Sequence, residues 1–284
     1  MFHSYKGGTG KSLISMNVAA GLLNEGKRVA IFDFDFLGPG LFSTFVPQVE
    51  QARVKELLYL NDLFFKPSKH VDIESVLLDM TRDSDKPDSK FYVGLANPEP
   101  SEINFLSRLT KAQSMEAFRK ILMAQEYLFD ELALDYLVID AGPGFRFDVA
   151  NAMMISDVIT SVMKPSESDL AGTKHLLKSI SAFVGGKTQG IVINREVSKQ
   201  ANPGFDYEDV QILRSRQEEL VDDIVAYAKA LGVPVFGSIP CLCDVARGET
   251  YQSIITREYP NHVFAKAVAE ILENIRKEQS SRSD

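Results

Sequence analysis

The sequence predicts an α/β fold: a doubly wound, mostly parallel β-sheet flanked by helices. Three observations predict it. A glycine-rich segment, Tyr5–Ser12, lies between a short apolar run and a helical run. Apolar runs typical of parallel strands buried on both faces alternate with helical segments along the chain. Acidic residues end two of these runs. Because ligands of doubly wound sheets bind at the carboxyl ends of strands, we expect a site there.

The length and composition favour one soluble domain spanning residues 1–284. Of the 284 residues, 45% are hydrophobic and 25% are charged, which is ordinary for a globular protein. No apolar run reaches the roughly 18 residues that a membrane-spanning helix needs. The glycine-rich segment begins too early for a signal peptide, so we expect a cytoplasmic location. The net charge of −8 argues against tight nonspecific DNA binding, which needs a basic face.

Apolar runs bounded by turn residues predict the strands. After the strand expected at residues 91–96, the prolines of Asn97–Pro100 stop regular strand pairing. The expected strands are residues 2–5, 29–32, 91–96, 134–140, 158–162, 190–195 and 233–240.

Apolar periodicity and terminal glycines predict the helices. Gly26 closes the first helix and Gly232 the penultimate one. The expected helices are residues 12–24, 57–63, 71–77, 114–129, 169–184, 214–231 and 263–277. In the helix at 114–129, the spacing of four apolar side chains predicts one buried face. These four are Met115, Phe118, Leu122 and Met123.

The glycine-rich segment has the composition of a phosphate-binding loop. Its glycines let successive N–H groups point into one concavity at a helix N-terminus, where the helix dipole also favours an anion. Lys11 is then expected to reach the β- and γ-phosphates, and the Ser12 hydroxyl to coordinate Mg²⁺. The nucleotide-binding residues expected in this loop are Gly7, Gly8, Thr9, Gly10, Lys11, Ser12 and Leu13.

Two further motifs place acids at strand ends. Asp33 and Asp35 follow the second expected strand, and both can lie near the γ-phosphate if that strand neighbours the first. Asp140 ends another apolar strand in a Walker B pattern and is expected to hold Mg²⁺ through a water. The Gly142–Gly144 segment after it is expected to change conformation with the γ-phosphate.

Three motifs in order resemble those of the ParA/MinD family of ATPases. They are the Lys6–Ser12 loop, which is similar to the deviant Walker A motif, the Asp33–Asp35 segment, and Asp140–Gly144. The resemblance implies a single-domain ATPase with the P-loop fold that uses ATP and Mg²⁺. In it Asp35 orients the attacking water, Asp33 is structural or linked to magnesium, and Ser12, Asp35 and Asp140 hold the metal, partly through water.

The same resemblance implies a two-subunit site. Lys6 would cross to the nucleotide of a partner subunit, so that ATP promotes a homodimer that hydrolysis releases. Asn194 and Pro240 would lie beside the adenine, although Asn194 in a capping or turn role remains open. A protein activator or cargo, in cell division, partition or organelle placement, is implied but not identified.

Other functions remain open. Cys241 and Cys243 allow a metallocentre-maturation ATPase, although their place in the expected base loop disfavours metal binding. An ATP-dependent synthetase of the dethiobiotin type uses the same fold. A bacterial tyrosine kinase is disfavoured because no tyrosine cluster ends the chain, and the acids Asp35 and Asp140 argue against a nonhydrolysing scaffold.

Three segments carry no catalytic motif but could bind a membrane or a partner protein. The helix at 263–277 is amphipathic, as are membrane-binding helices of MinD-type relatives, but its mixed charges favour a packing helix over a peripheral membrane anchor. The polar loop at 196–207 is a candidate interaction site. Residues 46–130 carry no predicted chemistry.

Overall fold

The computed structural model has the predicted α/β fold, with an eight-stranded, mostly parallel sheet flanked by helices. It describes residues 1–49, 54, 56–66, 71–196, 208–242, 245 and 254–283. The predicted loop at 196–207, apart from its first residue, therefore lies outside the described residues, as does Cys243. The strands are β1 (Phe2–Ser4), β2 (Arg28–Phe34), β3 (Leu77–Asp79), β4 (Lys90–Gly94), β5 (Tyr136–Pro143), β6 (Val158–Met163), β7 (Thr188–Glu196) and β8 (Val235–Pro240).

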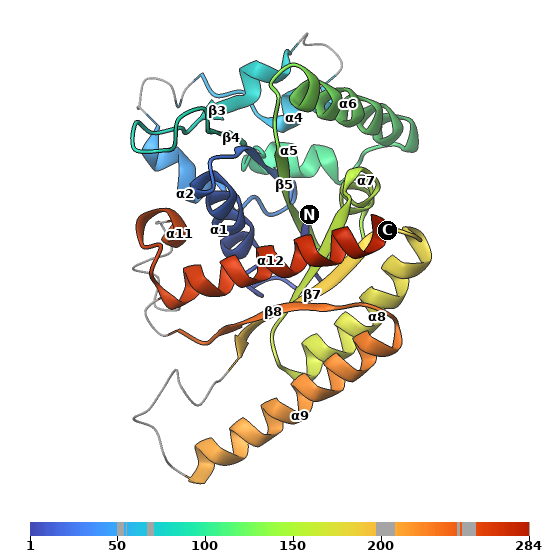
Figure 1. Cartoon of the computed structure of the whole chain (residues 1–284). Helices are drawn as coiled ribbons and strands as arrows, with labels where there is room; N and C mark the ends of the chain where they lie inside the picture. Colours follow the sequence, from blue (N-terminus) through green and yellow to red (C-terminus); the bar gives the residue numbers. More distant parts are fainter. Residues whose placement is uncertain are drawn as a thin grey trace. The chain divides into compact units, whose positions relative to one another are not determined.

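Helices alternate with these strands along the chain (Figure 1). The longer ones are α1 (Lys11–Asn24), α5 (Pro100–Leu106), α6 (Lys111–Asp130), α7 (Phe147–Ile155), α8 (Glu167–Phe183), α9 (Glu208–Ala230) and α12 (Val263–Ser283). The short ones are α2 (Phe42–Phe45), α4 (Leu60–Phe65), α11 (Ile255–Glu258) and the 3₁₀ turns η1 (Val46–Gln48) and η2 (Ile73–Val76). None of the described helices is both long and apolar enough to cross a membrane.

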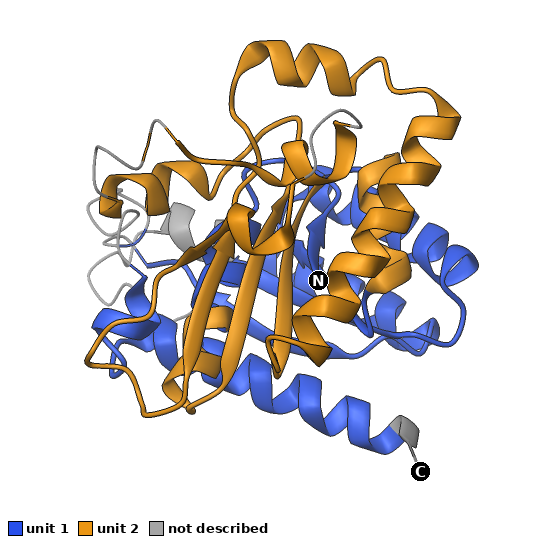
Figure 2. Cartoon of the chain, turned by 90° about the horizontal axis from the view of Figure 1, so that it is seen from above, with its two compact units in different colours: residues 1–18, 143–145, 156–284 blue, residues 19–142, 146–155 orange. Residues whose placement is uncertain are grey.

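The chain divides into two compact units (Figure 2). Unit 1 contains residues 1–18, 143–145 and 156–284, and unit 2 contains residues 19–142 and 146–155.

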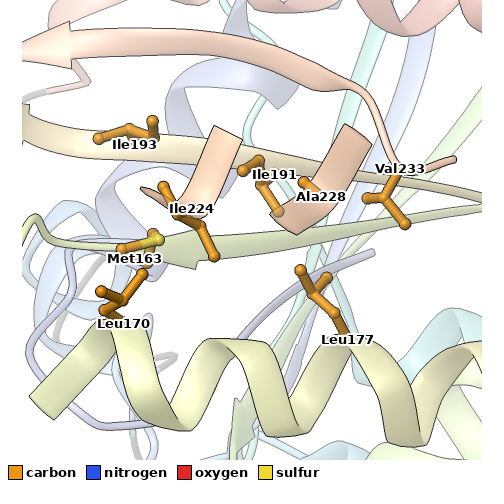
Figure 3. Packing of buried hydrophobic residues seen from close by; sticks show 8 residues of the cluster. All are labelled: Met163, Leu170, Leu177, Ile191, Ile193, Ile224, Ala228 and Val233. Carbon is orange, nitrogen blue, oxygen red and sulfur yellow. The ribbon is translucent and has the colours of Figure 1, made fainter. Parts of the chain in front are cut away.

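In unit 1 the strands β1, β6, β7 and β8 lie side by side in that order, all parallel. Helices α8 and α9 pack over β6 and β7 around a core of aliphatic side chains (Figure 3). Ile191 and Ile193 of β7 point into this core, and Leu177 of α8 and Ile224 of α9 close it. The core holds these strands in place, and with them the residues at their carboxyl ends.

Helix α12 covers the other side of β7 and β8 (Figure 1). Phe264, Val268 and Ile271 are almost fully buried, with exposed fractions of 0–1%. Asn274 Nδ2 donates a hydrogen bond of 2.9 Å to the Phe236 carbonyl of β8. The apolar stripe predicted at 263–277 is therefore covered within unit 1.

In unit 2 the strand order is β3-β4-β2-β5. Strand β3 is antiparallel to β4, and the other pairs are parallel. Aromatic rings pack beside the carboxyl end of β2: the Phe34 ring centroid lies 5.2 Å from that of Phe36 and 5.8 Å from that of Phe64. This packing fixes the end of the strand that carries Asp33 and Asp35.

Several predicted elements need correction. The helix predicted at 57–63 begins at Leu60 instead, and the helix predicted at 71–77 is a 3₁₀ turn followed by the edge strand β3. Helices α5 and α7 were not predicted. Pro100 had been interpreted only as a breaker, whereas it occupies the first turn of α5, where its missing N–H costs no hydrogen bond.

The buried face predicted for the helix at 114–129 is wrong. In α6, Met115 is 65% exposed, Met123 is 55% exposed and Leu122 is 44% exposed. The buried residues of α6 are Ala117, Ile121, Ala124 and Leu128. Helix α6 contacts α4 and α7, and because apolar residues occur on more than one face of α6, their spacing alone did not identify the buried one.

Candidate functional site

The glycine-rich loop of unit 1 has the geometry of an anion cradle. Gly8 and Gly10 have φ of 73° and 89°, the left-handed conformation that a side chain disfavours. Helix α1 begins at Lys11, so its first free N–H groups face the end of the loop. The Lys11 side chain is buried, with its Nζ 3.4 Å from Ser12 Oγ. The lysine and hydroxyl expected to bind phosphate and Mg²⁺ therefore lie together.

Asn194 braces this loop. Its Nδ2 donates a hydrogen bond of 2.7 Å to the Thr9 carbonyl, and its Oδ1 accepts one of 3.0 Å from the Arg195 N–H. A Cβ on Gly10 would lie 2.2 Å from Asn194 Nδ2, so no other residue fits there without displacing the brace. The sequence could not reveal this role, because 185 positions separate Asn194 from Thr9.

A hollow beside the loop brings together several predicted base-site residues. Its lining residues come from the loop, the ends of β7 and β8, and α12: Gly10, Leu13, Asn194, Arg195, Ile239, Pro240, Cys241, Leu242, Val245 and Phe264. Arg195 was not predicted. It has φ of 61° and lies where the register between β7 and β8 shifts, and a bulge of this kind redirects a side chain.

Cys241 lies in this lining as a free, half-buried thiol. Its N–H donates to the Glu196 carbonyl at 2.8 Å, which fixes the backbone at the end of β8. Cys241 therefore lines the same hollow as Asn194 and Pro240.

Lys6 is held differently from Lys11. Its side chain is exposed, while its carbonyl accepts a hydrogen bond of 2.8 Å from Ser4 Oγ. The hydrogen bond therefore fixes the backbone at the start of the loop, while the lysine side chain is exposed. An exposed cation of this kind can reach a group on another molecule.

In unit 2, Asp33 organises the segment after β2. Its Oδ1 accepts a hydrogen bond from the Asp35 N–H, and its Oδ2 accepts hydrogen bonds from the N–H groups of Gly40 and Leu41, each at 3.0 Å. The carboxylate is fully buried. Of the two roles predicted for Asp33, these bonds favour the structural one, because they fold residues 35–41 back onto the strand end.

Asp35 lies beside an arginine that the sequence did not single out. Asp35 Oδ1 is 3.6 Å from Arg146 Nη2, and Arg146 in turn binds Asp148 through two hydrogen bonds of 2.6 and 3.2 Å. Burial acts to lower the pKa of the Arg146 guanidinium, but the two carboxylates raise it above its ordinary value overall. Arg146 is therefore a permanent cation.

Asp140 lies opposite Asp33 on the paired strands β2 and β5, and both carboxylates are fully buried. Strand β2 pairs with β4 on one edge and β5 on the other. The condition set for the two acids, that β2 neighbours the first strand, is therefore not met, because β5 lies between β2 and β1 in the sheet. Adjacency to β5 places the two acidic motifs in one register.

No cluster of three His, Cys, Asp or Glu side chains suited to a metal occurs among the described residues. Mg²⁺ is commonly held by one or two protein oxygens, substrate phosphates and water. The Ser12 hydroxyl and the carboxylates of Asp35 and Asp140 offer only oxygen, the donor that Mg²⁺ prefers.

Comparison with known proteins identifies the family. Residues 1–193 match AAA_31, an AAA domain family. The chain belongs to it as a member of the ParA/MinD group of P-loop ATPases. This ParA/MinD-type chain is also similar to the septum site-determining protein MinD of Helicobacter pylori, at 25% identity over 84% of this chain and 75% of that one.

Solved structures share the fold of this ParA/MinD-type ATPase. The septum site-determining protein MinD of Pyrococcus horikoshii, complexed with Mg-ADP, has a TM-score of 0.66 at 18% identity and covers 99% of this chain and 96% of its own. MinD in the MinC:MinD complex of Aquifex aeolicus has a TM-score of 0.66 at 17% identity, covering 98% and 94%. A synthetase shares the fold as well: cobyrinic acid a,c-diamide synthase of Mycobacterium smegmatis, with ADP and magnesium bound, has a TM-score of 0.63 at 14% identity, covering 99% and 95%.

Proposed function

We propose that this ParA/MinD-type chain, a single functional domain over residues 1–284, is an ATP-hydrolysing switch. It dimerises when ATP is bound and in that state recruits a partner protein. The observation that carries the proposal is the loop Lys6–Ser12, in which a buried lysine, Lys11, and an exposed one, Lys6, flank a braced glycine turn. We assign Lys11 to the chain's own nucleotide and Lys6 to a neighbouring molecule.

Nucleotide binding is assigned to unit 1. The N–H groups of Gly7–Leu13 would hold the phosphate oxygens, Lys11 would neutralise the β- and γ-phosphates, and the hollow between Asn194 and Pro240 would take the base. The P. horikoshii relative was solved with Mg-ADP, which supports the choice of ligand.

Hydrolysis is assigned to Asp35, with Lys6 stabilising the charge that develops on the phosphates. Mg²⁺, when bound, neutralises phosphate charge, and Ser12, Asp35 and Asp140 would hold it, partly through water. Asp35 would orient the attacking water through its carboxylate. A lysine supplied by the partner subunit acts by the same physics as an arginine finger.

The test is ATP binding and hydrolysis by three variants. Lys11→Ala should lose nucleotide binding, because it removes the buried cation that we assign to the phosphates. Asp35→Ala should bind ATP with a Kd within about twofold of the wild type yet lose most turnover. Lys178→Ala, a change at an exposed lysine of α8, is the control and should match the wild type.

Two results would reject the proposal. One is a wild-type protein without ATPase activity in the presence of Mg²⁺. The other is an Asp35→Ala protein that hydrolyses ATP at the wild-type rate. Turnover linked to a small-molecule product would instead favour the synthetase, the alternative that the M. smegmatis enzyme keeps open on fold alone. Zinc or iron bound at Cys241 would favour the metallocentre alternative.

A further inference from the structure

Arg146 is anchored on a buried carboxylate. Its Nη2 donates to Asp148 Oδ2 at 2.6 Å and its Nε donates to Asp148 Oδ1 at 3.2 Å. The Asp148 side chain is only 1% exposed and lies in the first turn of α7. Two parallel charge-assisted bonds fix the plane of a guanidinium, so Arg146 has a defined orientation instead of the mobility of a surface arginine.

The same guanidinium faces Asp35. Its Nη2 lies 3.6 Å from Asp35 Oδ1, and the Asp35 side chain is 14% exposed. Gly142 borders this contact: a Cβ added there would lie 2.7 Å from Arg146 Nη2 and 2.7 Å from Asp35 Oδ1. The approach of the two side chains therefore depends on a glycine at position 142.

We infer that Arg146 is a positioning residue for Asp35. The inference rests on the proposed function, in which Asp35 orients the attacking water. A carboxylate that orients water has to be held within a fraction of an ångström and a few tens of degrees. The anchored cation attracts one oxygen of Asp35 and limits the rotation of its carboxylate. Arg146 thus acts on the reaction through Asp35, with Asp148 as its support.

The experiment compares steady-state hydrolysis of Mg-ATP by wild type, Arg146→Gln and Arg146→Lys. Glutamine keeps much of the volume but removes the charge, so kcat should fall by about 10- to 100-fold, as for a group displaced by an ångström. KM and the nucleotide Kd should stay within about twofold, because Arg146 is assigned no part in binding. Lysine keeps the positive charge but lacks the planar guanidinium that makes two parallel hydrogen bonds. The kcat of Arg146→Lys should therefore lie between those of Arg146→Gln and the wild type.

A matched control and a double variant separate positioning from a structural role. Arg119→Gln removes another arginine of unit 2, 61% exposed and paired with Glu116, and should leave kcat unchanged. If Arg146 acts through Asp35, then Asp35→Ala combined with Arg146→Gln should be no slower than Asp35→Ala alone. If Arg146→Gln fails to fold because Asp148 is left unpaired, the variant Arg146→Gln/Asp148→Asn removes both charges, and the same loss of kcat is expected.

The inference is overturned if Arg146→Gln, or the paired variant, keeps wild-type kcat while Asp35→Ala has lost it. A further loss of kcat when Arg146→Gln is added to Asp35→Ala would also overturn it, since the two residues would then act independently. A wild type without activity rejects the proposed function itself and is recognised in the same assay.

Discussion

At the scale of single residues, two acids that are close in the sequence have different roles. Asp33 and Asp35 stand two positions apart, yet Asp33 is buried under three backbone N–H groups while Asp35 faces a cation. The motif predicted that acids would occur here. It could not assign their roles, because these depend on how residues 35–41 fold back and on Arg146, more than a hundred positions away.

Asn194 gives the first residue-scale prediction. Because its amide braces the loop through the Thr9 carbonyl, Asn194→Ala should weaken binding of tripolyphosphate, which carries no base, as well as binding of ATP. Loss of one buried hydrogen bond corresponds to roughly 1–3 kcal/mol, or about 5- to 150-fold in Kd. Isothermal titration calorimetry with both ligands measures the effect.

The control for this prediction is Ser179→Ala, a change at a partly exposed serine of α8 whose hydroxyl donates to the His175 carbonyl of the same helix, and it should leave both affinities unaltered. If Asn194→Ala weakens ATP and leaves tripolyphosphate unchanged, Asn194 serves the base and not the loop.

At the scale of elements, hydrophobic periodicity located most strands and helices but did not always find their buried faces. Helix α12 met the expectation because its apolar stripe is continuous and β8 covers it. In α6, Met115, Leu122 and Met123 are exposed, and a sequence gives no sign of which face of a helix will meet a neighbour. The edge strand β3 was missed for a related reason, since three residues are too few to show alternation.

Helix α12 carries the prediction at this scale. Ile271 is fully buried in unit 1, so Ile271→Ala should lower the free energy of unfolding by about 2–5 kcal/mol. Glu270→Ala changes the exposed neighbour and should cost less than about 0.5 kcal/mol. Chemical denaturation monitored by circular dichroism compares the two.

The wild type and Ile271→Ala also test whether α12 binds membranes. With its apolar stripe packed on β8, wild-type α12 should not bring the protein down with vesicles of anionic lipid, with or without ATP. Co-sedimentation with such vesicles, or an Ile271→Ala protein as stable as the wild type, would show that the stripe is available for another use.

At the scale of the whole molecule, the order of motifs predicted the fold and family better than the details of the site. A phosphate loop before a helix, followed by acids at two strand ends, restricts the chain to a P-loop architecture, and the match over residues 1–193 agrees. The brace from Asn194 and the arginine beside Asp35 were not predictable, because both join residues far apart in the sequence.

The central claim is that Lys6 serves the nucleotide of a second copy of the chain. The measurement is sedimentation velocity of Asp35→Ala and of Lys6→Ala/Asp35→Ala, each with Mg-ATP, after titration has shown that both bind ATP. Asp35→Ala keeps ATP unhydrolysed and should sediment as a dimer, whereas the double variant should bind ATP and remain a monomer. A double variant that still dimerises with ATP would contradict the account.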